Sequence, residues 1–410
     1  MNFQPFVLQS WMFIYILNIY MYLSIKYIYP SSSVRNTSSI SCLKWGDENR
    51  FFIQYNNVPM GVERVGNRVF VTIPGRRYGI PSTLNYIDFN DVAITRSPHL
   101  KPYPDIRTAR TLTSVYRTRA DQCGRLWMVD TGRLELPVRQ RQIQQPAIVI
   151  FDLNTNRLIR RYELKNTDLP AENTPTGLAS ITIDITNGDC DDAYAYIPDL
   201  TTFGLIVYSL RENDSWRHHG FLFCFLPDQR FAWSDGVFSV ILLPGTGGCR
   251  TAAFHPLIGF HEFSVSTCVL KNRTIVNDRN YFIVGDRGGN TQSTMHDYHP
   301  GSNVVFYGEI GRDALTCWNA GQVLQSTSIG VLARDPQRLS YPSDVHVTGD
   351  EVWLMANTLP RFGYSTLDTN EYNFYVYSLT LGIRPLVSIT TTVNEVLVLS
   401  CGCTCYKRSR

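Results

Sequence analysis

The chain has 410 residues, of which 44% are hydrophobic and 12% aromatic, and its formal net charge at pH 7 is only +3. That apolar content is enough to build a core and excludes an intrinsically disordered chain. The near-neutral charge balance gives no sign of a nucleic-acid partner or of an acidic substrate. The length suits either two ordinary domains or one large β domain.

The N-terminus carries an almost wholly apolar run at residues 7–29, which is followed by three serines. We predict that residues 1–30 are a cleaved signal peptide, so that the mature protein is secreted, extracellular and without membrane contact. A membrane anchor is the alternative, because no basic residue precedes the run and no clear A-x-A cleavage site follows it. Asn18, Ser24 and Lys26 interrupt the run and count against a membrane span.

Three N-x-S/T sequons are compatible with a secreted glycoprotein. They begin at Asn36, Asn213 and Asn272, and we take these residues as candidate glycosylation sites.

One strand–turn–strand pattern recurs along the chain. Residues 111–132 predict two strands joined by a tight turn at 121–124, and the second strand, LWMV, is apolar as a buried strand would be. A strand, a Gly/Asp/Asn turn and an apolar or aromatic strand follow one another in five further stretches: 61–73, 181–198, 235–257, 292–310 and 343–357.

The six copies predict an all-β fold, a single six-bladed β-propeller with about four strands per blade over residues 42–380. The second strands of successive copies lie 48 to 67 residues apart, near the length of a four-stranded blade. A hairpin at 147–164 is an example of the outer strands. An array of β-sandwich domains is the alternative, but it does not explain why one pattern recurs six times. Residues 381–410 form an atypical, cysteine-containing tail.

Ten cysteines are compatible with disulfides in an oxidising compartment. Cys123 and Cys190 occupy the same turn of consecutive repeats, so we expect them to pair. Cys317 is expected to pair with one of Cys401, Cys403 and Cys405. A metal-binding knot in the tail is the alternative for these three, but C-G-C-T-C lacks the spacing of a closed zinc site.

In a closed propeller the first strand of every blade surrounds a central channel, and the starts of these strands share one mouth. Carboxylates, hydroxyls and amides that converge there suit a small ligand, above all a cation, with nearby aromatic rings adding cation–π attraction. The alternative is that the carboxylates merely bond strand ends and turns. The ligand-binding candidates are Asp235, Gln292, Ser343, Asp344 and Asn357.

The sequence shows no catalytic signature. There is no G-x-S-x-G elbow, complete P-loop or H-E-x-x-H motif, so the catalytic residues are unknown and we expect no cofactor. His218, His219, His296 and His299 are expected to be exposed loop histidines rather than metal ligands, because spacing brings them no acidic or cysteine partner.

Short motifs in the order of a known family run from about residue 43 to residue 379. They are 56–61 (NNVPMG), 68–74 (RVFVTIP), 79–84 (GIPSTL), 101–104 (KPYP), 121–132 (DQCGRLWMVDTG), 190–209 (CDDAYAYIPDLTTFGLIVYS), 233–236 (WSDG), 254–257 (FHPL), 262–267 (EFSVST), 287–293 (RGGNTQS), 317–319 (CWN) and 373–374 (NF).

With these motifs the chain resembles the yellow / major royal jelly protein family of insects. The resemblance implies a secreted six-bladed propeller with a role in cuticle pigmentation and melanin chemistry. In some relatives a biogenic amine binds in the central cavity, and this pocket would map near Ser343, Asp344 and Asn357. A few relatives convert dopachrome. Residues 217–230, shorter than in the family, and the tail 381–410 depart from the pattern.

Three functions therefore stand side by side. The first is a pigmentation protein that binds a biogenic amine or catechol-derived ligand. The second is an enzyme that isomerises or tautomerises dopachrome, a reaction in which a carboxylate or histidine can transfer the proton. The third is a structural or storage protein without a ligand.

Overall fold

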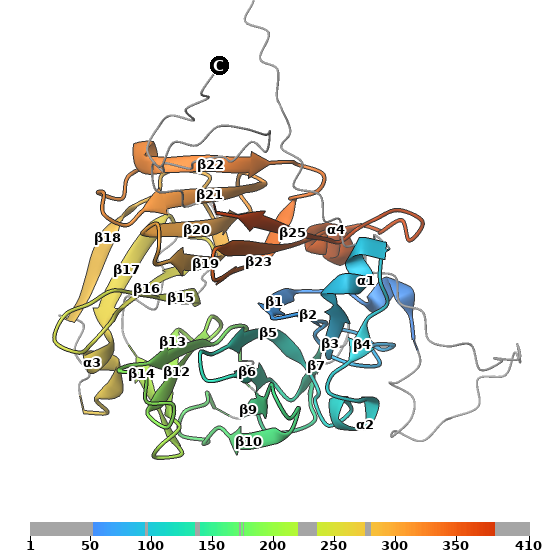
Figure 1. The fold of residues 1–410 in the computed structure, drawn as a ribbon, viewed down its shortest axis with the longest axis horizontal. Helices are drawn as coiled ribbons and strands as arrows, with labels where there is room; N and C mark the ends of the chain where they lie inside the picture. Colours follow the sequence, from blue (N-terminus) through green and yellow to red (C-terminus); the bar gives the residue numbers. More distant parts are fainter. Residues whose placement is uncertain are drawn as a thin grey trace, which may run out of the picture.

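The computed structural model describes residues 52–94, 97–135, 140–171, 174, 176–219, 236–274 and 280–381. Within them the chain forms a six-bladed β-propeller, which confirms the predicted fold (Figure 1). The predicted signal segment 1–30, Asn36, Asp235 and Cys401 lie outside the described residues.

Each blade is an antiparallel sheet whose strands follow one another from the centre outward, and the first strands contact one another around the ring. Blades one and two comprise β1 (Gly61–Val65), β2 (Arg68–Thr72), β3 (Leu84–Asp88) and β4 (Lys101–Pro102), then β5 (Val115–Ala120), β6 (Arg125–Asp130), β9 (Ala147–Asp152) and β10 (Leu158–Glu163). Blades three and four comprise β11 (Thr182–Ile185), β12 (Ala193–Asp199), β13 (Gly204–Ser209) and β14 (Asp214–His219), then β15 (Val237–Leu243), β16 (Thr251–Pro256), β17 (His261–Ser266) and β18 (Tyr281–Asp286). Blades five and six comprise β19 (Ser293–His299), β20 (Val304–Glu309), β21 (Ala314–Asn319) and β22 (Ile329–Arg334), then β23 (Tyr341–Thr348), β24 (Glu351–Asn357) and β25 (Tyr375–Thr380).

The remaining elements are short and decorate the blades. They are a hairpin of β7 (Arg133–Glu135) and β8 (Gln140–Gln142), the helices α1 (Phe89–Ile94), α2 (Ile106–Ala109), α3 (Thr267–Lys271) and α4 (Leu359–Tyr364), and the 3-10 turns Gln54–Asn56 and Ser326–Ser328. None of the helices among the described residues is long and apolar enough to cross a membrane.

The β5–β6 turn shows how local chemistry sets the blade pattern. The turn predicted at 121–124 ends in Gly124, whose φ of 73° is a conformation that glycine adopts without steric cost. One carboxylate oxygen of Asp121 accepts hydrogen bonds from the backbone amides of Cys123 and Arg125 at 2.9 and 3.0 Å. A side chain that bonds its own turn in this way favours the reversal and sets the two strands in register.

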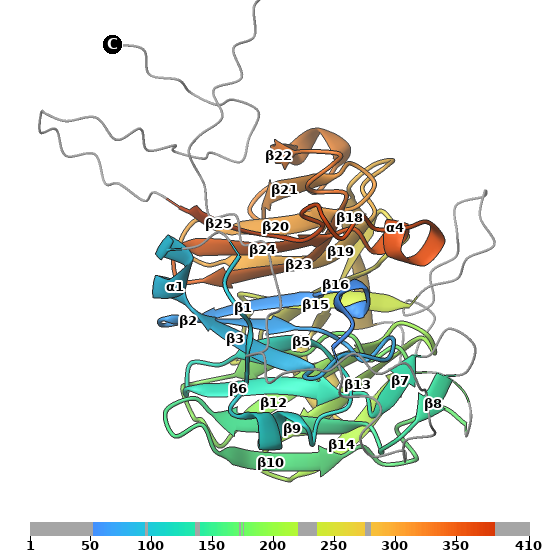
Figure 2. The ribbon, with the colours of Figure 1, turned by 90° about the vertical axis from the view of Figure 1, so that its right-hand side faces the viewer.

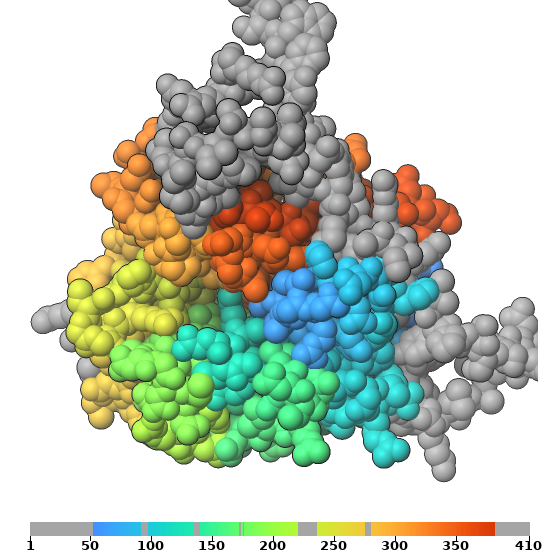
Figure 3. Space-filling model, in the orientation of Figure 1, coloured from blue at the N-terminus to red at the C-terminus, as the bar shows by residue number. Residues whose placement is uncertain are grey.

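The hydrophobic core lies between neighbouring blades. Blades two and three share a cluster that includes Trp127 and Tyr208, while Val62 of blade one packs in another cluster with Trp353 of blade six. Figure 2 shows the last blade directly beside the first, and the two are in contact in the space-filling view of Figure 3. Each sheet therefore buries both faces only because the ring is closed.

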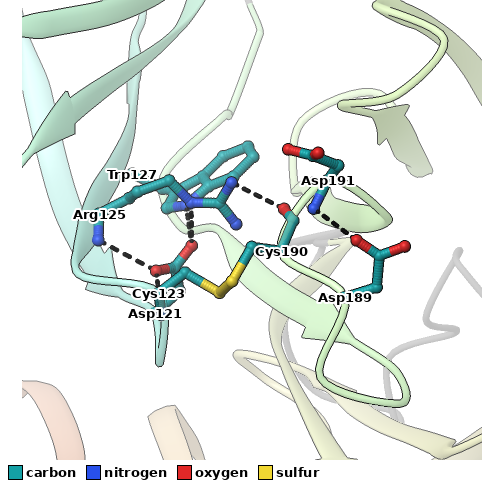
Figure 4. The surroundings of a disulfide bond; sticks show 7 residues. All are labelled: Asp121, Cys123, Arg125, Trp127, Asp189, Cys190 and Asp191. Atoms are coloured by element: carbon teal, nitrogen blue, oxygen red, sulfur yellow. Dashed lines mark hydrogen bonds and ion pairs between the residues drawn. A yellow bond between two sulfur atoms is a disulfide. The ribbon is translucent and has the colours of Figure 1, made fainter.

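Disulfides join or brace blades. Cys123 and Cys190 are bonded, as expected from their equivalent turns, and link blade two to blade three (Figure 4). The same junction is held by Arg125, which donates to the Cys190 carbonyl at 2.8 Å. Sequence analysis missed the bond between Cys249 and Cys268 within blade four.

Cys317 is buried in β21 and is disulfide-bonded, and Cys401, one of its three expected partners, lies outside the described residues. The sequons at Asn213 and Asn272 are both exposed, so glycosylation there stays a prediction that the surface permits.

Removing the Cys123–Cys190 bond by replacing both residues with serine should lower the free energy of unfolding by about 2–5 kcal/mol. The matched control is the serine pair at Cys249 and Cys268. The first bond closes a loop of 67 residues and the second a loop of 19, so loop entropy makes the first loss about 1 kcal/mol the larger. Denaturant unfolding measures both, and an equal or reversed loss would contradict the prediction.

Candidate functional site

Apolar side chains near the starts of several first strands pack against one another. Met60, Tyr116 and Ala179, from blades one, two and three, pack together in one cluster. Leu200, Tyr341 and Leu359 pack against them, with Tyr341 beginning β23 of the last blade. Among the described residues, the mouth therefore holds an aromatic and aliphatic cluster.

Ser343, Asp344 and Asn357 come together, but they face the backbone of blade one. The Ser343 hydroxyl donates to the Met60 carbonyl at 2.8 Å, and the Asn357 amide donates to the Pro59 carbonyl at 2.8 Å. All three side chains are at most 1% exposed. Their polar atoms thus close the ring between the last blade and the first.

Asp344 makes the most of these contacts. One of its oxygens accepts the Val62 backbone amide at 2.9 Å and lies 3.1 Å from Nε2 of His346. The other lies 3.6 Å from Nε of Arg117. The carboxylate is therefore paired with internal cations and held by backbone.

Gln292 lies apart from this group. It is half-buried just before β19, and its backbone carbonyl accepts the Ile310 amide at 2.8 Å. The fifth ligand candidate, Asp235, falls outside the described residues, so its predicted place at the mouth is untested.

Charged side chains of four first strands meet behind the mouth, in what we call the axial charge cluster. Nδ1 of His346 lies 2.9 Å from a carboxylate oxygen of Glu63, and Arg119 pairs with Asp297 at 2.6 Å. With His346 protonated, three positive groups balance three carboxylates. The members of the cluster are Glu63, Arg117, Arg119, Asp297, Asp344 and His346.

Electrostatics keeps His346 charged. Burial disfavours the imidazolium, but the carboxylates of Asp344 and Glu63 outweigh it and raise the pKa of His346 to about 9. Burial likewise opposes ionisation of Asp297, yet Arg119 and His346 lower the pKa of that carboxyl. The cluster is a neutral salt-bridge network at physiological pH.

A second buried group lies between blades four and five, and we call it the blade four–five cluster: His255, Glu262, Arg287 and His296. Glu262 lies 3.0 Å from Nε2 of His296, 3.3 Å from Nδ1 of His255 and 2.8 Å from Nη1 of Arg287. Burial and the neighbouring His296 lower the pKa of His255 to about 3, while the two histidines lower the pKa of Glu262 against its burial.

These histidines correct one sequence-based expectation. His296 and His299 are at most 2% exposed in β19, and His218 is buried in β14, so only His219 of the four is exposed. The expectation failed because their carboxylate partners come from other strands: Glu262 contacts His296 from β17 of the neighbouring blade.

A cavity of about 250 Å³ opens between blades one and two, and sequence analysis did not find it. The segment that leads from β2 to β3 reaches both regions, since Arg76 lies 5.3 Å from the ring centroid of Tyr116 at the mouth and Arg77 lines the cavity. We call it the arginine cavity. Its lining includes Arg77, Tyr78, Arg110, Leu112, Leu134 and Ile143.

The lining of the arginine cavity includes two arginines and several apolar residues. Phe362 of α4 holds Arg77 in place, with the guanidinium carbon 4.0 Å from the ring centroid. Arg110 follows α2 and is exposed. None of the described residues that line the cavity is a carboxylate or a histidine. This lining suits a small anion that carries an apolar ring and disfavours a protonated amine.

Comparison with known proteins gives one family. The sequence profile described as "Major royal jelly protein" matches residues 113–384. The chain is 41% identical to "L-dopachrome tautomerase yellow-f" of Drosophila melanogaster over 349 residues, which are 80% of each chain. It is 35% identical to "Protein yellow" of Drosophila pseudoobscura pseudoobscura over 383 residues, 88% of this chain and 66% of that one.

Among solved structures, the virginiamycin B lyase of Staphylococcus aureus is similar with a TM-score of 0.43 at 11% identity. The alignment covers 80% of this chain and 96% of the lyase.

The pKa of His346 gives the axial charge cluster a pH signature. The folded state binds a proton that the unfolded state releases from near pH 6.5, so stability should be full below that pH and fall as pH rises towards 9. Replacing His346 with glutamine should flatten this fall in denaturant unfolding curves between pH 6 and pH 9. His219→Gln, at an exposed histidine, is the control and should keep the wild-type slope. An unchanged slope in the His346 variant would contradict the assignment.

Proposed function

Because the chain belongs to the major royal jelly protein family, which includes the yellow proteins, we propose that it acts in pigmentation chemistry by converting dopachrome at the arginine cavity. One observation carries the choice among the family's expected functions: the described lining includes two arginines and no carboxylate. Dopachrome bears a carboxylate on a flat bicyclic ring, whereas a biogenic amine is a cation. The relative with 41% identity, named a dopachrome tautomerase, supports the same choice.

The reaction requires the protein only to bind the substrate and to transfer protons. Tautomerisation moves two protons, one from the carbon that bears the carboxylate and one from the adjacent CH2, to the two quinone oxygens, so it needs neither oxidant nor reductant. Arg77 and Arg110 would pair with the carboxylate, while Leu112, Leu134 and Ile143 contact the ring. The phenol of Tyr78, 39% exposed at the cavity, is the group placed to relay the proton.

Export of the protein is part of the proposal. The described residues hold two complete disulfides, and such bonds form and persist in oxidising compartments. Together with the apolar N-terminal run and the sequons, they support a secreted protein whose partner is a small molecule.

Amine binding is the second candidate, and the sequence favours it through Asp235, a carboxylate outside the described residues. It predicts binding of dopamine, serotonin or octopamine that weakens when Asp235 becomes asparagine. In the described residues, Asp344 and Asn357 are bonded internally, which counts against their contacting a ligand.

Kinetic assays of variants distinguish substrate binding from proton transfer at the cavity. Arg110→Ala should raise KM for dopachrome about tenfold by removing a charge-assisted contact, and Tyr78→Phe should lower kcat with little change in KM. Arg157→Ala, an exposed arginine in the β9–β10 turn, is the matched control and should behave as wild type. Loss of dopachrome absorbance measures turnover.

Calorimetry with the three amines and dopachrome runs in parallel. Amine binding without turnover would replace the enzyme proposal with the binding one. If neither binding nor turnover is detected, the result would favour a structural or storage protein.

A further inference from the structure

Buried polar atoms without hydrogen-bond partners gather in the blade four–five cluster. Nε2 of His255 and Nε of Arg287 make no hydrogen bond among the described residues, while Nδ1 of His255 lies 3.3 Å from Glu262. The side chains of His255 and Arg287 are fully buried. Buried polar groups are nearly always paired, because an unpaired one costs about 1–3 kcal/mol. Unpartnered atoms also occur in the axial charge cluster, but only here among the described residues do they accompany a group of metal-ligating side chains.

We propose that His255, Glu262 and His296 bind a divalent transition-metal ion, with zinc the best match. Their ligand atoms all lie within 4.8 Å of one another. The two histidine nitrogens lie 3.3 and 3.0 Å from the Glu262 oxygens. Zinc bonds of about 2.0–2.2 Å in a tetrahedron place neighbouring ligand atoms roughly 3.3–3.5 Å apart. Two imidazoles and a carboxylate are a donor set that zinc takes in proteins, with the fourth position left to water.

Two neighbours orient these ligands from behind. Nδ1 of His296 lies 2.7 Å from the Ser239 hydroxyl, so its other nitrogen, Nε2, faces Glu262. Arg287 donates to Glu262 at 2.8 Å and to the Gly259 carbonyl at 3.1 Å. Such outer contacts fix the tautomer and direction of metal ligands. With the ion bound, Nδ1 of His296 donates to Ser239, and the ion takes the position of the proton between Nε2 and Glu262.

Arg287 is the main argument against an ion, since it adds a positive charge beside the site. It contacts Glu262 through only one oxygen, Oε2, which leaves Oε1 facing His296. A carboxylate that bridges a guanidinium and a metal ion is compatible with the charges here, because both histidines bind as neutral ligands.

Burial determines how the ion would behave. The three ligand side chains are at most 1% exposed, so the ion enters while the blades assemble and is then retained. The ligands come from β16 and β17 of blade four and from β19 of blade five, so the ion would fasten these two blades together. This site is separate from the arginine cavity between blades one and two, and it does not rest on the proposed function.

The test measures metal in the full-length protein, secreted into zinc-supplemented medium, purified without metal-affinity resin and dialysed against EDTA. We expect about one zinc ion per chain by plasma mass spectrometry. His296→Gln should lower that content about tenfold or more. His299→Gln is the matched control, because His299 is a buried histidine of the same strand, and it should retain the zinc.

A measurement on the wild-type protein covers the case in which the His296 variant does not fold. Protein produced with cobalt in place of zinc should show the visible absorption of a four-coordinate nitrogen and oxygen site. Wild-type protein with less than about 0.1 metal ion per chain and no cobalt absorption would overturn the proposal. Full zinc content in a folded His296→Gln variant would overturn it too, since the ion would then lie elsewhere.

Discussion

Closure of the ring is the constraint on which the rest of the structure depends. A propeller sheet has two faces to bury, and the first and last blades can bury theirs only against each other. Val62 and Trp353 share one hydrophobic cluster at that junction. Asp344 accepts the Val62 amide across 282 positions of sequence, and Asn357 reaches the Pro59 carbonyl across 298. Hydrogen bonds of these kinds contribute about 0.5–3 kcal/mol each, and they also hold the two blades in register.

Closure explains why the polar residues at the centre are poor ligand contacts. Paired charges in an apolar surrounding are stable only when each finds its partner, and the axial charge cluster achieves this with His346 protonated. A ligand that took Asp344 from His346 and Arg117 would leave Arg117 without a carboxylate and His346 with Glu63 alone. A ligand-binding site is therefore more compatible with the edge of the ring. There Arg77 and Arg110 line a cavity, and a ligand would not weaken the closure.

The two buried polar groups differ in their balance of carboxylates and cations. In the axial charge cluster the charges of Glu63, His346 and Asp344 meet at 2.9 and 3.1 Å. In the blade four–five cluster one carboxylate, Glu262, serves two histidines and an arginine, and both groups include buried polar atoms without a hydrogen-bond partner. The first group has the composition of a structural salt-bridge network. The second has the composition of a ligand set, which is why it carries the inference of a metal site.

The sequence by itself determined the blades. Alternating strands and turn residues such as Asp121 and Gly124 act over a few positions, so the six repeats and the propeller were predictable from pattern, and specific motifs gave the resemblance to the family. Cys123 and Cys190 could be paired because equivalent positions of consecutive repeats lie side by side.

Only the tertiary structure decided which side chains meet between blades. The partners of His296 and Asp344, the cavity between blades one and two, and the Cys249–Cys268 bond were not found in the sequence. The local sequence pattern indicates which face of a strand is buried. Which residues contact that face depends on how the sheets pack on one another and on the closure of the ring.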